Sequence, residues 1–564
     1  MKKVFMISVL FYLFIFISDI FSYVFFRADM VLINGVIWTS EKNPEWVNSI
    51  AIFEDRIIYA GDKEHIKTLI GKGTEVIDLN GKFAMPGFID AHVHFMSGGF
   101  YLLGVKLKDA KNEQEFAERI KKKALALPDG AWILKGTWDH NAWPGGNLPT
   151  KELIDRYTEK NPVFVSSYDG HTALANSLAL KLAGITKDTP DPKGGVIIKD
   201  AETGEPTGIL KDAAINLVRR VIPEPDRETS LLAARTAIKE ANRYGVTSVQ
   251  DMGSFKDLEI YQGLRKRGEL KVRISERPPI AMWKRLYQPR ILNLFGDNYL
   301  RISGLKAFVD GSLSSSTAWF FEPYLNQPDN CGVAMYPEGA LEKLILEVDK
   351  AGYSVSVHAS GDRANSFILD VFERVIKENG ERDRRFKIEH AQHLRPEHFK
   401  KYAKLNAIAS VQPYHAIDDG QWAEQRIGRE RCKRTYAFKS LHDNGVRLAF
   451  GSDWTVAPLN PLQTIYAAVT RRTIDDKNPD GWFPKQKICL KDALLAYTIN
   501  SAYAVFEENI KGSIKPGKLA DIVLLSDNLF EIDPVKIKDV KAEMTILGGE
   551  IVYDSGRLKK KRID

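Results

Sequence analysis

The sequence predicts an α/β protein: a (β/α)₈ TIM-like barrel, a composite β-sandwich built from both termini, and a large insertion after the first barrel strand. Three observations predict this fold. From Gly339 onward, amphipathic helical segments alternate with short apolar strands, which is typical of a parallel sheet with crossover helices. Short alternating strands with turn signals occur at both ends of the chain. Polar side chains stand where several apolar strands end, as they do at the active-site face of such barrels.

The composition is that of a globular protein with more than one domain. The chain has 564 residues, of which 44% are hydrophobic and 27% charged. Part of the net charge of +7 lies in the terminal run Lys559 to Arg562, which we interpret as a solvated tail. No basic stripe interleaved with aromatic residues occurs, so we expect a small-molecule substrate and no nucleic-acid partner. The three cysteines lack CxxC spacing, which argues against a disulfide framework and a thiolate zinc site.

The N-terminus predicts export. After two lysines, an uninterrupted apolar run extends from Val4 to Ile17, the length of a signal-peptide core. Asp19 interrupts the run, but apolar residues resume as far as Phe26, so a retained anchor fits residues 1–27 as well as a cleaved signal peptide does. We therefore expect a protein that is exported or membrane-anchored and faces outside the cytoplasm, with membrane association through this segment.

Beyond the N-terminal apolar run, the two ends of the chain have the character of one small β domain. Residues 28–82 form short alternating segments broken by Asn34-Gly35 and Glu54-Asp55, and residues 514–557 have the same pattern. We expect these two regions to pair into the β-sandwich. The middle of the chain would then be inserted between them.

The middle divides into a barrel and an insertion. We assign residues 83–100 and 228–513 to the barrel, and residues 101–227 to a lobe or lid that emerges after strand 1. The expected strands, some with the loops that follow, lie near residues 89–94, 245–253, 270–276, 300–312, 353–362, 385–394, 407–413 and 446–454.

Histidines and an aspartate stand at the ends of these strands. In "IDAHVHF", His92 and His94 are two residues apart and so lie on one face of strand 1. His358 and His390 close the fifth and sixth strands, and Asp453 follows the eighth. Because the carboxyl ends of barrel strands share one face, we expect these groups to meet there. Nitrogen and oxygen ligands of this kind suit zinc and its first-row neighbours.

The ligand set can hold one or two divalent ions. His92, His94 and Asp453 would bind one ion, and His358 and His390 a second. Two neighbouring cations need a negative bridge, and Lys306 would supply it if its amine were carboxylated to a carbamate. A lysine inside an apolar strand is otherwise unusual.

Four other histidines are expected on the solvent side of loops and helices. They are His393, His398, His415 and His442.

The chain resembles the amidohydrolase superfamily, and within it the branch typified by N-substituted formamide deformylases. The motifs that carry the resemblance are "MPGFIDAHVH", "LKAFVDGS", "VHASGDRAN", "IEHAQHL", "FGSDW" and "SIKPGKLADIVLLS". The resemblance extends from about residue 28 to 554 and implies a metal-dependent hydrolase with the barrel and sandwich described above. It maps the metal positions onto His92, His94, Lys306, His358, His390 and Asp453.

The same resemblance places substrate-side segments in the insertion. "GTWDHNAW" contains Trp138 and "SSYDGHTALANSLAL" contains His171, which is expected to reach the pocket. Asp310, in the loop after strand 4, is a third candidate for substrate contact. For Trp138 the alternative is core packing of the lobe, and for Asp310 it is shaping of its loop.

The predicted reaction is hydrolysis of a non-peptide carbon–nitrogen bond, in an amide, formamide or cyclic amide, by a metal-activated hydroxide. Asp453 would act as general base and then acid, and His171 would stabilise the tetrahedral anion. A deaminase or esterase on the same barrel, and a non-catalytic surface binding protein, are the alternatives. The substrate's identity and the oligomeric state do not follow from the sequence.

Overall fold

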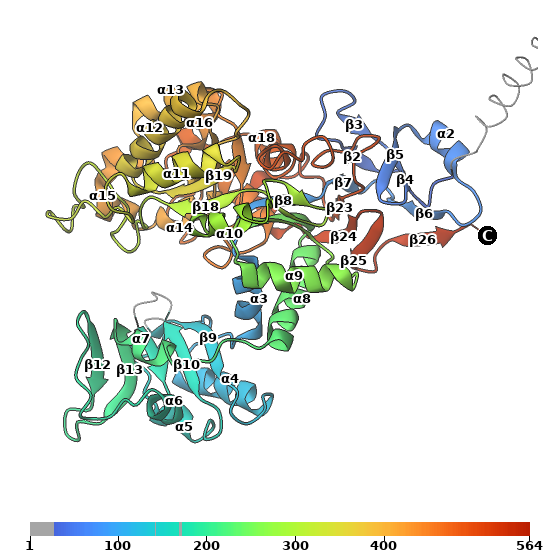
Figure 1. The fold of residues 1–564 in the computed structure, drawn as a ribbon. Coiled ribbons are helices and arrows are strands. Elements are labelled where there is room, and N and C mark those ends of the chain that lie inside the picture. The colour runs from blue at the N-terminus through green and yellow to red at the C-terminus, as the bar shows by residue number, and fades with distance from the viewer. Residues whose placement is uncertain (1–26, 141–142, 168–171, 564) are drawn as a thin grey trace, which may run out of the picture. The chain divides into compact units, whose positions relative to one another are not determined.

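The computed structural model describes residues 27–140, 143–167 and 172–563 (Figure 1). The chain divides into two compact units. The first comprises the residues up to Val93 together with Lys239–Ser254 and Leu270–Asp564, and the second comprises His94–Ile238 and Phe255–Glu269. Each unit is described by itself.

Strands from both ends of the chain share two sheets in the first unit. One sheet has the order β26-β6-β1-β4-β5 and the other β25-β24-β23-β7-β2-β3. In Figure 1 the blue N-terminal and red C-terminal strands lie side by side. The strands of the first sheet are β1 Met30–Ile33, β4 Ser49–Phe53, β5 Arg56–Gly61, β6 Glu75–Asp78 and β26 Lys559–Arg562. Those of the second are β2 Val36–Trp38, β3 Trp46–Val47, β7 Phe83–Pro86, β23 Ile522–Leu525, β24 Ala542–Leu547 and β25 Glu550–Asp554.

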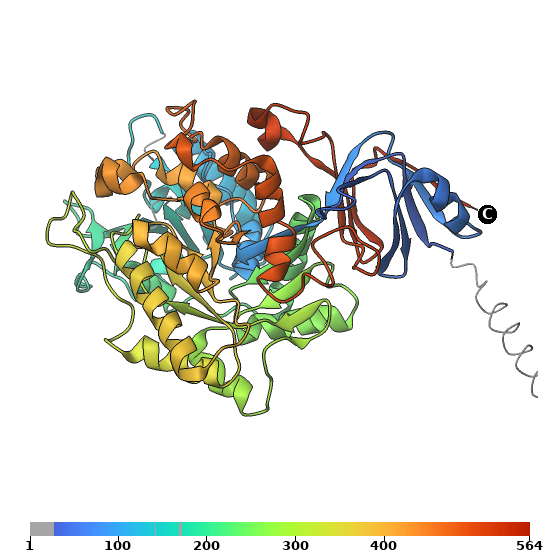
Figure 2. The same ribbon diagram turned by 90° about the horizontal axis from the view of Figure 1, so that it is seen from above.

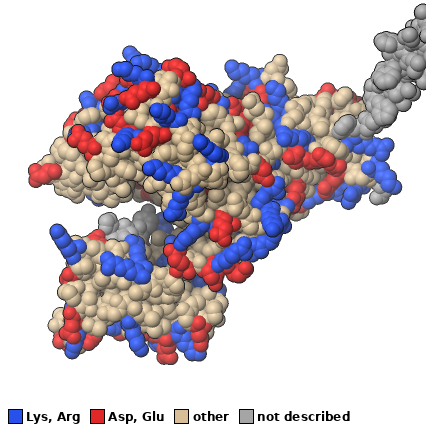
Figure 3. Space-filling view, in the orientation of Figure 1, with Lys and Arg blue, Asp and Glu red and all other residues tan. Residues whose placement is uncertain are grey.

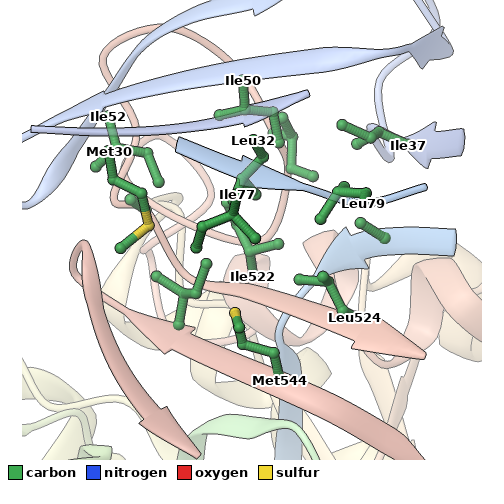
Figure 4. Close-up of a cluster of buried hydrophobic side chains, with 14 of the residues drawn as sticks. Met30, Leu32, Ile37, Ile50, Ile52, Ile77, Leu79, Ile522, Leu524 and Met544 are labelled. Atoms are coloured by element: carbon green, nitrogen blue, oxygen red, sulfur yellow. The ribbon is translucent and has the colours of Figure 1, made fainter. Parts of the chain in front are cut away.

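The two sheets share one apolar core. Alternate residues of each strand point to the same face, so Met30 and Leu32 of β1 contribute together with Ile522 and Leu524 of β23. Figure 4 shows these side chains pointing toward one another. Each is at most 5% exposed, and burying one such side chain stabilises the fold by about 1.5–3 kcal/mol.

The terminal basic run differs from the expected solvated tail. Lys559–Arg562 forms β26, an edge strand that pairs antiparallel with β6, although all four side chains stay exposed. Lysines on an edge strand discourage pairing with another chain. On the face drawn in Figure 3, basic and acidic side chains are interspersed.

The strands expected for the barrel form two further sheets. Their orders are β16-β17-β15-β14-β8 and β18-β19-β20-β21-β22, and all neighbouring pairs are parallel except β16 with β17. The strands of the first sheet are β8 Phe88–Val93, β14 Val246–Asp251, β15 Arg273–Glu276, β16 Phe295–Gly296 and β17 Leu300–Ile302. Those of the second are β18 Leu305–Phe308, β19 Val355–Ala359, β20 Lys387–His390, β21 Ile408–Val411 and β22 Leu448–Phe450.

The expected fourth strand is divided between these sheets. Leu300–Ile302 pairs with β15, whereas Leu305–Phe308 pairs with β19. The break falls at Gly304, whose φ is 140° and where a Cβ would lie 2.7 Å from the Ser354 carbonyl oxygen. Only glycine fits this close approach.

Amphipathic helices follow the later strands. α12 buries Ile368, Leu369, Phe372 and Val375 along one face, as the 3.6-residue period requires. The yellow and orange helices of this region lie side by side in Figure 2. The helices are α10 Trp283–Tyr287, α11 Ala340–Lys350, α12 Asp362–Asn379, α13 Pro396–Lys404, α14 Pro413–Asp419, α15 Ala423–Cys432, α16 Phe438–Asp443, α17 Pro461–Thr470, α18 Leu490–Ala496 and α19 Ile499–Tyr503.

The second unit is built on its own five-stranded sheet, with the order β12-β13-β11-β10-β9. Its core includes Phe116, Trp138 and Trp143. The strands are β9 Ile133–Trp138, β10 Val163–Ser167, β11 Thr172–Ala175, β12 Gly195–Lys199 and β13 Pro206–Asp212. Its helices are α3 Phe95–Leu103, α4 Glu113–Leu125, α5 Glu152–Asp155, α6 Ser177–Leu182, α7 Ile215–Arg219 and α9 Phe255–Lys266, and α8 Arg227–Arg243 extends into the first unit.

The N-terminal apolar run from Val4 to Ile17 lies outside the described residues. Among the residues that are described, no helix combines the length and the apolar character needed to cross a bilayer.

Candidate metal centre

Four strand ends bring together the histidines and the aspartate that the sequence singles out. His92 lies in β8, His358 in β19 and His390 at the end of β20, while Asp453 follows β22. The ring centroid of His390 is 4.8 Å from that of His92 and 4.5 Å from that of His358. His92 Nε2 lies 3.5 Å from Asp453 Oδ1. The predicted convergence of these four side chains is therefore seen.

His94 directly follows β8 and is partly exposed. His92, His94 and Asp453 each offer one ligand atom, and the three atoms lie within 4.8 Å of one another. This is the group that the sequence assigns to the first ion.

The backbone holds β22 tightly against β8. The Asp453 N–H donates to the His92 carbonyl oxygen at 2.8 Å, and the buried Asp90 carboxylate accepts from the N–H groups of His92 and Ser452. A Cβ at Gly451 would lie 2.5 Å from the His92 nitrogen. The glycine in "FGSDW" therefore permits the approach that places Asp453 beside His92.

Two of these residues occupy the left-handed backbone region. The φ angle is 74° at His390 and 55° at Asp453. Residues other than glycine rarely adopt this conformation, and backbone strain of this kind is concentrated at functional sites. In His390 and Asp453 the positive φ changes the direction of the side chain at the point where the strand ends.

Hydrogen bonds fix the orientation of each imidazole. His92 Nδ1 donates to Glu389 Oε2 at 2.7 Å, and His390 Nδ1 donates to Gln412 Oε1 at 2.8 Å. His358 Nε2 lies 2.9 Å from the Gly311 carbonyl oxygen, which can only accept. In each ring one nitrogen thus carries the proton, so the other is the one that can bind a cation.

Burial keeps these imidazoles neutral. It lowers the pKa of His92 to about 4 and that of His358 to about 3, and it lowers the pKa of His390 well below the ordinary value. Metal binding requires the neutral ring, because a protonated nitrogen has no lone pair to share. At neutral pH the site therefore presents ligands that are ready for a metal ion.

Lys306 is buried in β18, with 4% of its surface exposed. Its Nζ has no hydrogen-bond partner among the described residues and lies 5.0 Å from the centre of the Phe308 ring. Burial lowers the pKa of Lys306 to about 8, which raises the fraction of neutral amine. A neutral amine is the form of lysine that can react with carbon dioxide.

A buried charge pair behind His92 escaped the sequence reasoning. Lys387 and Glu389 lie two residues apart on one face of β20, with Nζ and Oε1 2.9 Å apart. Lys387 also donates to the Ala91 carbonyl oxygen and to Gln250 Oε1. Burial alone would raise the pKa of Glu389, but Lys387 and His92 hold it well below its usual range. The sequence does contain a signal for this pair, namely two opposite charges at positions i and i+2 of an apolar strand.

His415 was expected on the solvent side, and the structure corrects this. It is 6% exposed, on α14, and its Nε2 lies 4.0 Å from Asp453 Oδ2. Helix α14 starts within two residues of the end of β21, so its first turn stays at the strand-end face. The same expectation is wrong for His393 and His398, which are buried, and right for the exposed His442.

Two of the residues expected to contact the substrate, Trp138 and Asp310, are buried. Trp138 is fully buried in the core of the second unit, and its Nε1 donates to the Val165 carbonyl oxygen. Both carboxylate oxygens of Asp310 accept backbone N–H groups, from Ser360, Trp319 and Gly361. Burial raises the pKa of Asp310 to about 7. Their substrate contacts stay a prediction, and His171 lies outside the described residues.

Comparison with known proteins decides the family. A family model described as the amidohydrolase family matches residues 75–553. The chain belongs to the amidohydrolase family. It is therefore a metal-dependent hydrolase that acts on carbon–nitrogen bonds, as the histidine and aspartate motifs predict.

Several relatives of this amidohydrolase match over nearly their whole length. It is 40% identical to Protein LONG AFTER FAR-RED 3 of Arabidopsis thaliana (93% of this chain, 92% of the relative). It is 30% identical to the putative amidohydrolase YtcJ of Bacillus subtilis (92% and 98%) and 25% identical to the N-substituted formamide deformylase of Arthrobacter pascens (93% and 98%). The resemblance to the formamide deformylase branch is thereby confirmed.

A solved structure matches as well. An uncharacterized metal-dependent hydrolase from Pyrococcus horikoshii OT3 superposes with a TM-score of 0.76 and 31% identity, covering 90% of this chain and 99% of that one.

Proposed function

We propose that this amidohydrolase cleaves a non-peptide carbon–nitrogen bond, in an amide, formamide or cyclic amide, at a divalent metal centre. The observation that carries the proposal is the convergence of His92, His358, His390 and Asp453 at four strand ends. Three neutral imidazoles and a carboxylate meet there, within a few ångströms of one another. The family membership of the chain supports the reaction class.

The residues present fit a metal ion. His92, His94 and Asp453 would hold it, and imidazole with carboxylate is a donor set that zinc favours. A bound ion supplies Lewis acidity, which lowers the pKa of water and polarises a carbonyl oxygen. Lys306 is buried and its Nζ has no hydrogen-bond partner within the described part of the chain, which supports the proposal that a carbamate forms there and lies beside His358 and His390.

The chain's own residues would handle protons and position the substrate. The Asp453 carboxylate would accept a proton from the attacking water and return it to the leaving nitrogen. The Glu389 carboxylate holds the Nδ1 proton of His92, so this ring keeps one orientation during turnover. His171 would donate a hydrogen bond to the developing oxyanion.

We also propose that the two five-stranded sheets close into a (β/α)₈ barrel and that the two terminal sheets form a composite sandwich. A parallel bridge between Pro279 and Lys306 links the two inner sheets at one edge. The hydrogen bond from Asp453 N–H to the His92 carbonyl oxygen links them at the other. The core shared by β1 and β23 supports the sandwich. Residues 101–227 would be the lobe inserted after strand 1.

The N-terminal apolar run supports a proposal of export or membrane anchoring, with the catalytic unit outside the cytoplasm. Cell fractionation of the full chain tests it. Recovery from the cytoplasmic fraction, with the apolar run intact, would reject it.

The test is a panel of N-formyl and N-acyl amines offered to metal-replete protein, with detection of formate, acids and amines. We expect turnover of at least one member. Asp453→Asn is assayed at a saturating metal concentration, because Asp453 is also a proposed ligand. Its kcat should fall about 100-fold or more, because general acid–base catalysis contributes about 10²–10⁴-fold.

Product analysis separates the alternative reactions. Ammonia released from a ring substrate would indicate a deaminase, and an alcohol released from an ester would indicate an esterase. Metal binding without turnover of any of these substrates would favour a binding protein.

A further inference from the structure

A cavity of about 510 Å³ opens on the first unit beside the end of β18. Phe308 of this strand points toward the metal centre, with its ring 5.2 Å from that of His358. The next residue, Val309, points to the opposite face, as successive residues of an extended chain do, and lines the cavity. Trp319, the segment 334–339 and the beginnings of α11 and α12 complete the lining. The volume is within the range of small-molecule sites, about 300–1,000 Å³.

Three aromatic side chains line the cavity, namely Trp319, Tyr336 and Phe367, and all three are half-buried. The rings of Trp319 and Phe367 lie 6.3 Å apart at an angle of 58°. Val309 and Leu341, which are 2% and 3% exposed, add aliphatic surface. Partly exposed aromatic rings gain contact area when a further ring packs against them. The lining therefore favours a ligand that carries an aromatic ring.

Two opposite charges line the same cavity. The guanidinium of Arg363 is stacked 4.5 Å from the centre of the Trp319 ring and has no ion-pair partner among the described residues. A stacked guanidinium keeps its N–H edge available to a carboxylate. Glu338 is exposed and likewise forms no ion pair within the described part of the chain. The third charged residue of the lining, Glu342, is neutralised by Arg374 at 2.5 Å.

The backbone fixes the position of Trp319. Its N–H donates to Asp310 Oδ2 at 2.8 Å, and its carbonyl oxygen accepts from the N–H groups of Arg363 and Ala364. A Cβ at Gly361 would lie 2.0 Å from that carbonyl oxygen, so this close contact requires glycine. Trp319 and the start of α12 are therefore held together without a ligand. A site that is formed in advance loses little affinity to ordering on binding.

We propose that this cavity binds a free aromatic amino acid. The ring of the ligand would pack among the aromatic side chains, its carboxylate would accept from Arg363, and its ammonium would donate to Glu338. None of the proposed metal ligands lines the cavity, so the inference goes beyond the proposed function and does not depend on it. A free amino acid has no amide bond to cleave and is a ligand here, not a substrate.

The experiment compares three fluorinated probes that share one ring, by ¹⁹F NMR line broadening on full-length protein. 4-Fluoro-L-phenylalanine carries both charges, 3-(4-fluorophenyl)propanoate only the carboxylate, and 2-(4-fluorophenyl)ethylamine only the ammonium. Wild type should bind the amino acid about tenfold more tightly than either of the others, the contribution of one charge-assisted hydrogen bond at a partly exposed site. L-Alanine, which lacks the ring, should not displace it.

Two variants test the orientation of the ligand. Arg363→Gln should weaken binding of the amino acid and the propanoate about tenfold and leave the ethylamine unchanged. Glu338→Gln should weaken binding of the amino acid and the ethylamine and leave the propanoate unchanged. Arg395→Gln is the matched control, because it removes a guanidinium that is stacked on Phe321 outside the cavity, at 4.8 Å. It should bind all three probes as wild type does.

Metal-replete and chelator-treated proteins should bind the amino acid equally. Binding that disappeared with the metal would place the probe at the metal centre and overturn the inference. No broadening of 4-fluoro-L-phenylalanine by wild type, or equal affinities of wild type and Arg363→Gln, would also overturn it. Both charge variants alter exposed side chains, so thermal unfolding should match that of wild type and a loss of binding cannot be a loss of the fold.

Discussion

Single residues in the centre act through the orientation of imidazoles. Glu389 receives the Nδ1 proton of His92, and Lys387 balances the charge of Glu389 inside the protein. Neither residue is a ligand, but together they determine which nitrogen of His92 faces Asp453. A buried ion pair of this kind adds little stability, so its value here is positional.

Glu389→Gln should weaken binding of the metal ion by about 10–100-fold, the usual cost of losing an outer-shell partner. Glutamine still accepts a hydrogen bond but carries no charge to strengthen the imidazole as a ligand. Competition against a chromophoric chelator measures the affinity, with the exposed Glu373→Gln as control.

Folding and positioning effects can be separated at this site. In Glu389→Gln the ammonium of Lys387 loses its counter-charge, which can cost about 3–5 kcal/mol. The double variant Lys387→Met, Glu389→Gln should regain stability in urea unfolding while its metal affinity stays low. Metal affinity that returned together with stability would show that Glu389 has only a structural role.

Asp419 provides a pH-dependent contribution to stability. Burial raises the pKa of Asp419 to about 7 although the Tyr436 hydroxyl donates to its carboxylate. Because this pKa is higher in the folded than in the unfolded state, the contribution is complete below the ordinary value of 3.8 and is lost as pH rises through about 7.

Asp419→Asn removes this titration and keeps an acceptor for Tyr436. Its free energy of unfolding relative to wild type should therefore be more favourable at about pH 8.5 than at about pH 5.5. Urea unfolding of both proteins at the two pH values measures the difference. An identical difference at both values would exclude Asp419 as the titrating group.

At the scale of elements, the approach of β22 to β8 determines the site. The Cβ of Gly451→Ala would meet the backbone of His92 at 2.5 Å, so one strand end has to move. We expect a loss of about 1–3 kcal/mol in stability, typical of overpacking, together with weaker metal binding.

Gly263→Ala is the matched control for this substitution. Gly263 lies inside α9, and its added Cβ would meet the flexible ends of the Arg227 and Arg267 side chains, at 3.2 and 3.6 Å. Thermal unfolding with and without added metal compares the two variants. Equal stability and metal affinity of Gly451→Ala and wild type would refute the role of this contact.

The strands and helices also show how much of the fold can be predicted from the sequence. Each expected barrel segment contains a strand, because apolar segments followed by amphipathic helices have a clear period. The break of the fourth strand at Gly304 was not predictable, since it depends on a contact with Ser354, the residue before β19. His415 was missed for a similar reason: its distance to Asp453 follows from where α14 begins, and helical spacing alone does not give it.

At the scale of the whole molecule, metal binding should couple to the stability of the first unit. All the proposed ligands except His94 lie in that unit. An ion that binds only the folded state adds about 2.7 kcal/mol at a concentration 100 times its Kd. Added zinc should therefore raise the melting temperature of chelator-treated wild type, and this rise should be much smaller for His92→Ala. An equal rise in both proteins would place the ion elsewhere.

The most direct measurement is anomalous X-ray diffraction from crystals of zinc-replete protein, recorded on both sides of the zinc absorption edge. The account predicts an anomalous peak within bonding distance of His92 Nε2 and Asp453 Oδ1. A zinc-replete crystal without a peak between these two side chains, or with its strong peak among other residues, would contradict it.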